Sequence, residues 1–185
     1  MSTLELKELS HPAGEVIKIA AGKTLDLKSQ GTTTLPTGSV LQVVHGSYGT
    51  EASSSSNTYA DTGLTLNITP SSTSSKVLVI VSHPEVARLG SSAVPNTNLA
   101  IKLMRDSTDL TVMSSHIMDY IMSAQLSGGA GWIVISGPSV TYLDSPSSTS
   151  ALTYKTQFKN ASTNTNGVRI LGSTPSTITL MEVSA

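Results

Sequence analysis

The residues best suited to chemistry in this sequence are few, and they lie far apart. His83 lies two residues before Glu85, and an imidazole close to a carboxylate is a pair that binds zinc or another transition metal. None of the four histidines has a second histidine at the i, i+4 spacing that places two metal ligands on one helix face. Pro84 favours an extended turn between the two residues. We therefore expect His83 and Glu85 in a surface loop, without a metal.

Two carboxylates, Asp106 and Asp109, are close enough in sequence to be considered for acid–base catalysis. They flank two hydroxyl residues directly after Arg105, which is typical of a β-turn between strands, where aspartate hydrogen-bonds to its own backbone. Residues 127–131 are rich in glycine but lack the lysine of a phosphate-binding loop. The G-x-S-x-G motif of serine hydrolases is also absent. We expect no enzyme and assign no catalytic, cofactor-binding or metal-binding residue.

The composition of the whole chain favours β-structure. Ser and Thr make up 55 of the 185 residues, whereas charged residues are 12 % and aromatic residues 4 %. Hydrophobic residues reach 38 % at a net charge of −1, which differs from the low hydrophobicity and high net charge of disordered chains. Threonine is β-branched and suits the exposed face of a strand. The composition therefore predicts a folded β domain with a hydroxyl-rich surface.

The same numbers argue against several classes of partner. A net charge of −1 provides no basic field, so we expect no nucleic acid as a partner. No run of about 18 apolar residues is present, so we expect no membrane span. Cysteine is absent, which excludes a disulfide framework. The N-terminus lacks the apolar segment of a secretory signal peptide, so we expect none.

Short segments rich in aliphatic residues predict β-strands, separated by turns rich in Ser, Gly, Pro and Asn. The predicted strands are residues 39–45, 62–69, 76–82, 99–105, 132–136, 140–143, 152–159, 168–171 and 176–183. Residues 76–82 form a continuous apolar run, the pattern of a strand buried on both faces. Strands at this regular spacing indicate a sandwich or barrel.

Residues 116–122 leave two alternatives open. Apolar residues at 117, 118, 121 and 122 follow the spacing of a helix face. Alternation is also present if Met118, Tyr120 and Met122 share one side, and we favour a strand or irregular structure.

Charge is distributed unevenly and marks a boundary. Residues 1–28 hold eight of the 23 charged residues, whereas residues 29–75 hold two. Turn residues follow at Pro36 and beyond. We expect an N-terminal arm in residues 1–36 and a main domain in residues 37–185.

Inside this arm, residues 15–20 and 24–28 predict two short strands on either side of a turn at Gly22. An isolated β-hairpin is only marginally stable in water. The arm therefore needs the main domain, a second chain or another partner.

Stretches over most of the chain resemble structural proteins of tailed bacteriophages, especially marine and freshwater phages. They are Met1 to Leu6, Ile17 to Asp26, Leu35 to Val44, Tyr59 to Pro70, Ser74 to Val79, Tyr142 to Pro146, Tyr154 to Phe158 and Ile178 to Val183. Residues 84–131 depart most from this pattern. The resemblance implies a virion component with a jelly-roll-like β-sandwich, made in the host cytoplasm. It implies a homotrimer and contacts with the major capsid protein or other virion proteins, and no catalytic residue or cofactor.

Two functions agree with these expectations. The first is a capsid decoration, or cement, protein whose trimeric β domain projects from the head while residues 1–36 anchor it to the capsid. The second is a tail-fibre or receptor-binding tip that contacts glycans of the host surface. Only seven aromatic residues are available to stack on sugars, so the first is preferred.

Overall fold

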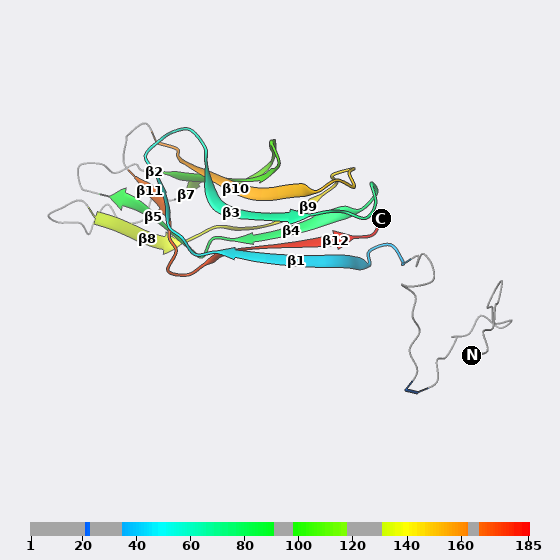
Figure 1. Ribbon diagram of the computed structural model, residues 1–185. Coiled ribbons are helices and arrows are strands. Elements are labelled where there is room, and N and C mark those ends of the chain that lie inside the picture. Colours follow the sequence, from blue (N-terminus) through cyan, green and yellow to red (C-terminus); the bar gives the residue numbers. More distant parts are fainter. Residues whose placement is uncertain (1–20, 23–34, 91–97, 118–130, 163–166) are drawn as a thin grey trace, which may run out of the picture. The chain divides into compact units, whose positions relative to one another are not determined.

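The chain folds into β-strands and turns (Figure 1). The computed structural model describes residues 21–22, 35–90, 98–117, 131–162 and 167–185. Within these residues the regular structure is entirely β, without a helix. The strands are β1 (Val40–Tyr48), β2 (Ala52–Ser54), β3 (Ala60–Ile68), β4 (Lys76–Ser82), β5 (Glu85–Gly90), β6 (Leu99–Arg105), β7 (Thr108–Ile117), β8 (Gly131–Ser136), β9 (Ser139–Asp144), β10 (Leu152–Asn160), β11 (Val168–Ile170) and β12 (Ser176–Val183).

Eight of these strands form a jelly-roll-like sandwich. One antiparallel sheet has the order β1-β12-β4-β9 and the other has the order β3-β10-β6-β7. When these eight strands are renumbered along the chain, the orders become 1-8-3-6 and 2-7-4-5. Strands from the two halves of the chain thus alternate within each sheet, as in the paired Greek keys of a jelly roll. The predicted all-β, jelly-roll-like sandwich is confirmed, whereas the predicted trimer stays a prediction.

The third sheet, β2-β11-β5-β8, continues the first sheet beyond a bend. Strand β4 leads into β5 across His83 and Pro84, and β8 leads into β9 across Gly137 and Pro138. In the same way β1 leads into β2 and β11 leads into β12. The strand order is therefore the same on both sides of the bend, which Figure 1 shows between β4 and β5.

The bend depends on two glycines that lie against the backbone of a neighbouring strand. A Cβ atom on Gly137 would lie 1.7 Å from the carbonyl oxygen of His83, and one on Gly172 would lie 2.1 Å from that of Gly49. Hydrogen bonds from His83 N to Pro138 O (3.0 Å) and from Gly137 N to Pro84 O (2.9 Å) close the bend. Any larger residue at these two glycines would displace backbone atoms.

The main core lies between the first two sheets. Its buried members include Leu64 of β3, Tyr154 of β10, Val79 of β4 and Leu180 of β12. A second cluster around Phe158 packs beside the third sheet. Both clusters arise from strict alternation, because successive side chains of a strand point to opposite faces. In β10, for example, every second residue is buried.

All nine strands predicted from the sequence are present, and each end lies within three residues of its predicted position. The prediction that residues 76–82 are buried on both faces is wrong for the described part of the chain. Val77, Val79 and Val81 are fully buried, but Ile80 on the other face is 38 % exposed. The reason is that β4 lies inside one sheet of a two-layer sandwich, so only one of its faces meets the second layer.

Three strands have no counterpart among the predicted segments. Strands β2 and β5 belong to the bent sheet, and β7 pairs with β6 in a hairpin. Strand β7 ends at Ile117, so the first two residues of the ambiguous segment 116–122 are strand residues. Residues 118–122 lie outside the described residues.

The chain divides into two units, Met1–Leu35 and Pro36–Ala185. The hairpin predicted in residues 15–20 and 24–28 lies outside the described residues, and the role of residues 1–36 as an arm stays a prediction. The described residues contain no helix of the length and apolarity needed to cross a membrane.

Candidate interaction surface

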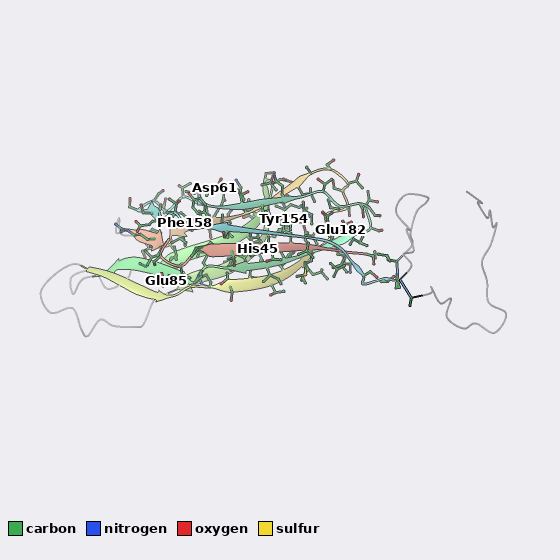
Figure 2. All side chains as sticks on the ribbon, turned by 60° about the horizontal axis from the view of Figure 1, so that its bottom comes forward. His45, Asp61, Glu85, Tyr154, Phe158 and Glu182 are labelled. Atoms are coloured by element: carbon green, nitrogen blue, oxygen red, sulfur yellow. The ribbon has the colours of Figure 1, made fainter. Side chains whose placement is uncertain are left out.

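The outer face of the sheet β3-β10-β6-β7 carries charged side chains in pairs. Asp61 of β3 accepts hydrogen bonds from Lys155 Nζ at 2.9 Å and from Gln157 Nε2 at 2.7 Å, both on β10. Lys102 of β6 forms an ion pair of 2.8 Å with Asp109 of β7. Alternation along the strands places these residues opposite the core. Figure 2 labels Asp61 at the outside of this sheet.

A β-bulge hollows this face beside Asp61. Lys155 pairs with Thr65 while Gln157 pairs with Asp61, so three residues of β3 lie opposite the single residue between Lys155 and Gln157. Gly63 within the bulge has a φ of +93°, and the ring of Tyr48 lies 2.3 Å from the position of a Cβ. Glycine is therefore required here. The resulting pocket of about 260 Å³ is lined by Asp61, Gly63, Leu64, Thr65, Thr153 and Lys155.

The charges of this pocket neutralise each other. Burial alone would raise the pKa of Asp61, but the hydrogen bonds from Gln157 and Lys155 and the nearby ammonium charge hold it below its ordinary value. Asp61 is therefore ionised at neutral pH. A paired carboxylate and ammonium beside two threonine side chains can hydrogen-bond a polar, uncharged ligand, such as the hydroxyl groups of a sugar.

An aromatic ring lies near the same face. The ammonium groups of Lys102 and Lys159 lie 4.4 Å and 4.7 Å from the centroid of the Tyr59 ring, within the range of cation–π interaction. One of these two ammonium groups, that of Lys102, also pairs with Asp109.

The pair His83 and Glu85, considered above as a metal site, does not come together. His83 is fully buried, and its ring contacts Ser176 Oγ through Nδ1 (2.8 Å) and Thr156 Oγ1 through Nε2 (3.1 Å). Glu85 instead accepts hydrogen bonds from Ser173 and Thr174. The predicted surface loop is wrong for His83, because the bend turns its side chain between the sheets. Among the described residues no group of three metal-ligating side chains is present.

His83 belongs to a buried chain of hydrogen bonds that crosses the sandwich. Thr156 Oγ1, which contacts the ring, also lies 2.6 Å from Thr62 Oγ1, and Thr62 in turn accepts from the backbone N–H of Leu64 within the bulge. The chain thus links the bulge of β3 to the bend after β4. Burial lowers the pKa of His83 to about 4, so its ring is neutral at neutral pH.

A second buried polar cluster, at the end of β9, was not found from the sequence. Asp144 accepts from Tyr154 Oη at 2.6 Å and from Arg105 Nη1 at 2.5 Å. Burial and the hydrogen bond to Asp144 raise the pKa of the Tyr154 hydroxyl. Burial alone would lower the pKa of Arg105, but Asp144 raises it. The signals in the sequence were Arg105 at the end of the predicted strand 99–105 and Asp144 directly after the predicted strand 140–143.

The carboxylates of the turn after β6 have separate partners. The turn between β6 and β7 is confirmed, and Asp106 in it has a φ of 50°. Asp106 Oδ1 accepts from the backbone N–H of Thr153 on β10 instead of from its own backbone. Asp109 pairs with Lys102, so the two carboxylates are held by different partners.

Comparison with known proteins finds weak structural likeness. No protein-family model and no curated protein matches the sequence. The solved structure of the infectious bursal disease virus VP2 subviral particle is similar at a TM-score of 0.37 and 14 % identity. That of the infectious bursal disease virus Gt strain is similar at a TM-score of 0.34 and 11 % identity. Each match covers 88 % of this chain and 42 % of the other chain, so this chain spans less than half of their length.

Both TM-scores are below 0.5, so the likeness carries no argument about this protein. Both structures come from a virus. The resemblance to structural proteins of tailed bacteriophages stays a prediction.

Proposed function

We propose that this protein is a structural component of a virus particle, a trimeric head decoration protein anchored by its N-terminal residues. The observation that carries the proposal is the way the two ends of the main unit are joined. Gly38 N donates to Ser184 O and Ser184 N donates to Ser39 O, each at 2.9 Å, while Ser184 Oγ donates to Pro36 O at 2.7 Å.

These bonds place the start of the main unit beside its C-terminus. Both ends lie at the end of the sandwich away from the bent sheet β2-β11-β5-β8 (Figure 1). A segment that binds a capsid would therefore attach the sandwich by one end and leave the bent sheet facing outward. This polarity is what a protein needs when it is fixed to a particle and exposes a rigid domain.

Two further features support a role in assembly. The stretches of residues 35–185 that resemble tailed-phage structural proteins overlap strands β1, β3, β4, β9, β10 and β12. The jelly-roll-like sandwich also has edge strands, to which a segment of another chain can add by β-augmentation. In the proposed particle, residues 1–35 add to a neighbouring capsid protein in this way.

The experiment compares the full chain with a variant that lacks residues 1–35, in binding to virus particles stripped of the protein. We expect the full chain to co-sediment with the particles and the shortened chain to remain in solution. The melting temperature of the shortened chain is the control, because the unit Pro36–Ala185 keeps both core clusters. Equal binding of both proteins contradicts the anchoring role.

The copy number per particle separates the head from the tail. Hundreds of copies, measured by densitometry of purified particles, indicate a head decoration protein. About a dozen or two copies indicate a tail component and contradict the proposal.

The pocket at the β3 bulge favours a second candidate, a tail-fibre or receptor-binding tip that contacts host-surface glycans. Its carboxylate, ammonium and hydroxyl groups can hydrogen-bond a sugar. A glycan array tests this candidate: binding that is lost in Asp61→Asn, but retained in Asp109→Asn on the same face, would support it.

A further inference from the structure

The outer face of β10 carries a row of polar side chains that leads away from the pocket at the β3 bulge. Every second residue of this strand points away from the core, and these residues are Thr153, Lys155, Gln157 and Lys159. Thr153 and Lys155 line the pocket, whereas Lys159 lies at the other end of the row. At about 3.3 Å per residue, the α-carbons of Lys155 and Lys159 lie about 13 Å apart. We call these four residues the β10 row.

The pocket end of the β10 row offers hydrogen bonds of both senses without a net charge. The charged groups that line the pocket are Asp61 and Lys155. One oxygen of Asp61 accepts from Lys155 and the other accepts from Gln157. A carboxylate oxygen can accept a second hydrogen bond, and an ammonium group has three N–H donors. An acceptor beside a donor suits a hydroxyl group, which donates and accepts, whereas an anion would face Asp61 and a cation would face Lys155.

The size of the pocket limits the unit that it can take. Its volume of about 260 Å³ lies below the range of about 300–1,000 Å³ that is usual for drug-sized ligands. Gly63 contributes no side chain to it, and Thr65 and Thr153 contribute both a methyl and a hydroxyl group. The pocket therefore fits one small ring that has both C–H and O–H groups, such as a neutral sugar ring.

The far end of the β10 row has an excess of positive charge. The ammonium groups of Lys102 and Lys159 lie 4.4 Å and 4.7 Å from the centroid of the Tyr59 ring. Lys102 forms an ion pair with Asp109, but among the described residues no carboxylate forms an ion pair with Lys159. Two ammonium groups thus gather at one ring with one carboxylate between them. This end of the row therefore attracts an anion.

Gln157 joins the two ends of the β10 row. It pairs with Asp61 of β3 on one side and with Lys102 of β6 on the other. Its Nε2 donates to Asp61 at 2.7 Å, and its Oε1 is an acceptor that a hydroxyl group of a ligand can use. Polar groups therefore continue from the pocket to Lys159 along the whole row.

We propose that the β10 row binds an acidic oligosaccharide, with a neutral sugar ring in the pocket and a negatively charged sugar beside Lys159. The inference rests on the second candidate function and names the ligand class of that site. A span of about 13 Å is longer than one sugar ring, so a ligand that reaches both ends is an oligosaccharide. The pocket distinguishes it from an acidic peptide, because Asp61 would repel a second carboxylate there.

The experiment applies the isolated full chain to an array of neutral, carboxylated and sulfated oligosaccharides, with a tetraglutamate peptide as the non-sugar control. The Kd of each acidic oligosaccharide that binds is then compared with the Kd of its carboxyl-reduced or desulfated counterpart. We expect the acidic form to bind about tenfold more tightly, because a charge-assisted hydrogen bond to Lys159 is added. This preference should shrink as the salt concentration rises, because salt screens exposed charges.

Variants separate the two ends of the row. Lys159→Gln should abolish the preference for the acidic form and leave the Kd of the neutral form unchanged. Lys76→Gln, at an exposed lysine on β4 of the other sheet, is the matched control and should keep the preference. Asp61→Asn should raise the Kd of both forms about tenfold or more, because an amide replaces the acceptor. Asp109→Asn removes the carboxylate that competes at Lys102, so it should tighten binding of the acidic form. Melting temperatures verify that all four variants fold.

Several outcomes overturn the proposal. They are equal affinity for the acidic and neutral forms, an unchanged preference in Lys159→Gln, and binding of the tetraglutamate peptide as tight as that of the oligosaccharides. In each of these cases, sugar binding that is lost in Asp61→Asn leaves the second candidate function intact. If no oligosaccharide binds, both the inference and the second candidate are contradicted. The head decoration role is tested separately, by particle binding of the chain without residues 1–35 and by copy number.

Discussion

Tyr154 donates its hydroxyl hydrogen to Oδ2 of Asp144 across 2.6 Å, and this bond joins β10 of one sheet to β9 of the other. The same oxygen accepts from Nη1 of Arg105 on β6. Three strands from two sheets therefore meet at one buried carboxylate.

Removal of this carboxylate should destabilise the sandwich strongly. Asp144→Ala leaves a largely buried guanidinium and hydroxyl without their acceptor, so we expect a loss of about 3–5 kcal/mol in the free energy of unfolding. Tyr154→Phe removes one hydrogen bond and should cost about 1–2 kcal/mol. Urea denaturation at pH 7 measures both.

The control for Asp144 is Asp109→Ala, which breaks the ion pair with Lys102 at the surface. Its cost should stay below about 1 kcal/mol. If Asp144→Ala and Asp109→Ala lowered the free energy of unfolding equally, the buried cluster would contribute no more to stability than a surface ion pair.

His83 should make the stability depend on pH in mildly acidic solution. Its pKa is lowered from 6.5 to about 4 in the folded protein, so the unfolded chain binds a proton first as the pH falls. The stabilisation is complete above about pH 6.5 and is lost as the pH falls toward about 4. A difference of about 2.5 pKa units corresponds to about 3 kcal/mol.

Urea denaturation between pH 7 and pH 4 tests this dependence. His83→Gln should flatten the slope of the unfolding free energy against pH, although it lowers stability at pH 7. His45→Gln, on the exposed face of β1, is the matched control for the loss of a histidine. An unchanged slope in His83→Gln would show that His83 is not the titrating group.

The bend should tolerate no side chain at Gly137. Gly137→Ala brings a Cβ to within 1.7 Å of a backbone oxygen, so backbone atoms must move, and we expect a loss of more than about 2 kcal/mol. Gly46→Ala is the matched control, because its Cβ would meet the flexible end of Leu66 at 3.2 Å and should cost less than about 1 kcal/mol. Thermal melting ranks the two variants, and the reverse order would contradict the role of Gly137 in the bend.

Glu182 should contribute stability that is lost in acid. Its carboxylate accepts from Gln42 Nε2 (2.6 Å) and from the backbone N and Oγ of Ser71 (2.7 and 2.6 Å). Burial alone would raise its pKa, but these hydrogen bonds lower it below 4.5. The contribution is therefore present above about pH 4.5 and disappears as the pH falls through the lowered pKa.

Glu182→Gln removes this charge. We expect a loss of about 1–2 kcal/mol at pH 7, because hydrogen bonds to a charged acceptor are stronger than those to an amide. The difference between variant and wild type should shrink toward pH 3. A difference that stays constant with pH would show that the carboxylate is not ionised in the folded protein.

Strand β4 and the residues after it illustrate which features a local sequence pattern predicts and which it does not. The apolar run of residues 76–82 was enough to predict the strand, because backbone propensity and pattern are local. Its continuation as β5 was missed, because Pro84 interrupts the pattern. The exposure of Ile80 was also missed, because a pattern does not reveal whether the second face has a cover.

The sequence by itself determined the all-β class, nine of the twelve strands in the described residues and the turn after Arg105. These features depend on the alternation of apolar and polar residues and on turn residues, which lie within a few positions of one another in the sequence. Only the tertiary structure decided which strands pair and which polar groups are buried. His83 meets Thr156 and Ser176, which are 73 and 93 residues away, and Asp144 meets Arg105, which is 39 residues away. Such contacts are created when distant strands align in register, and no local pattern encodes that alignment.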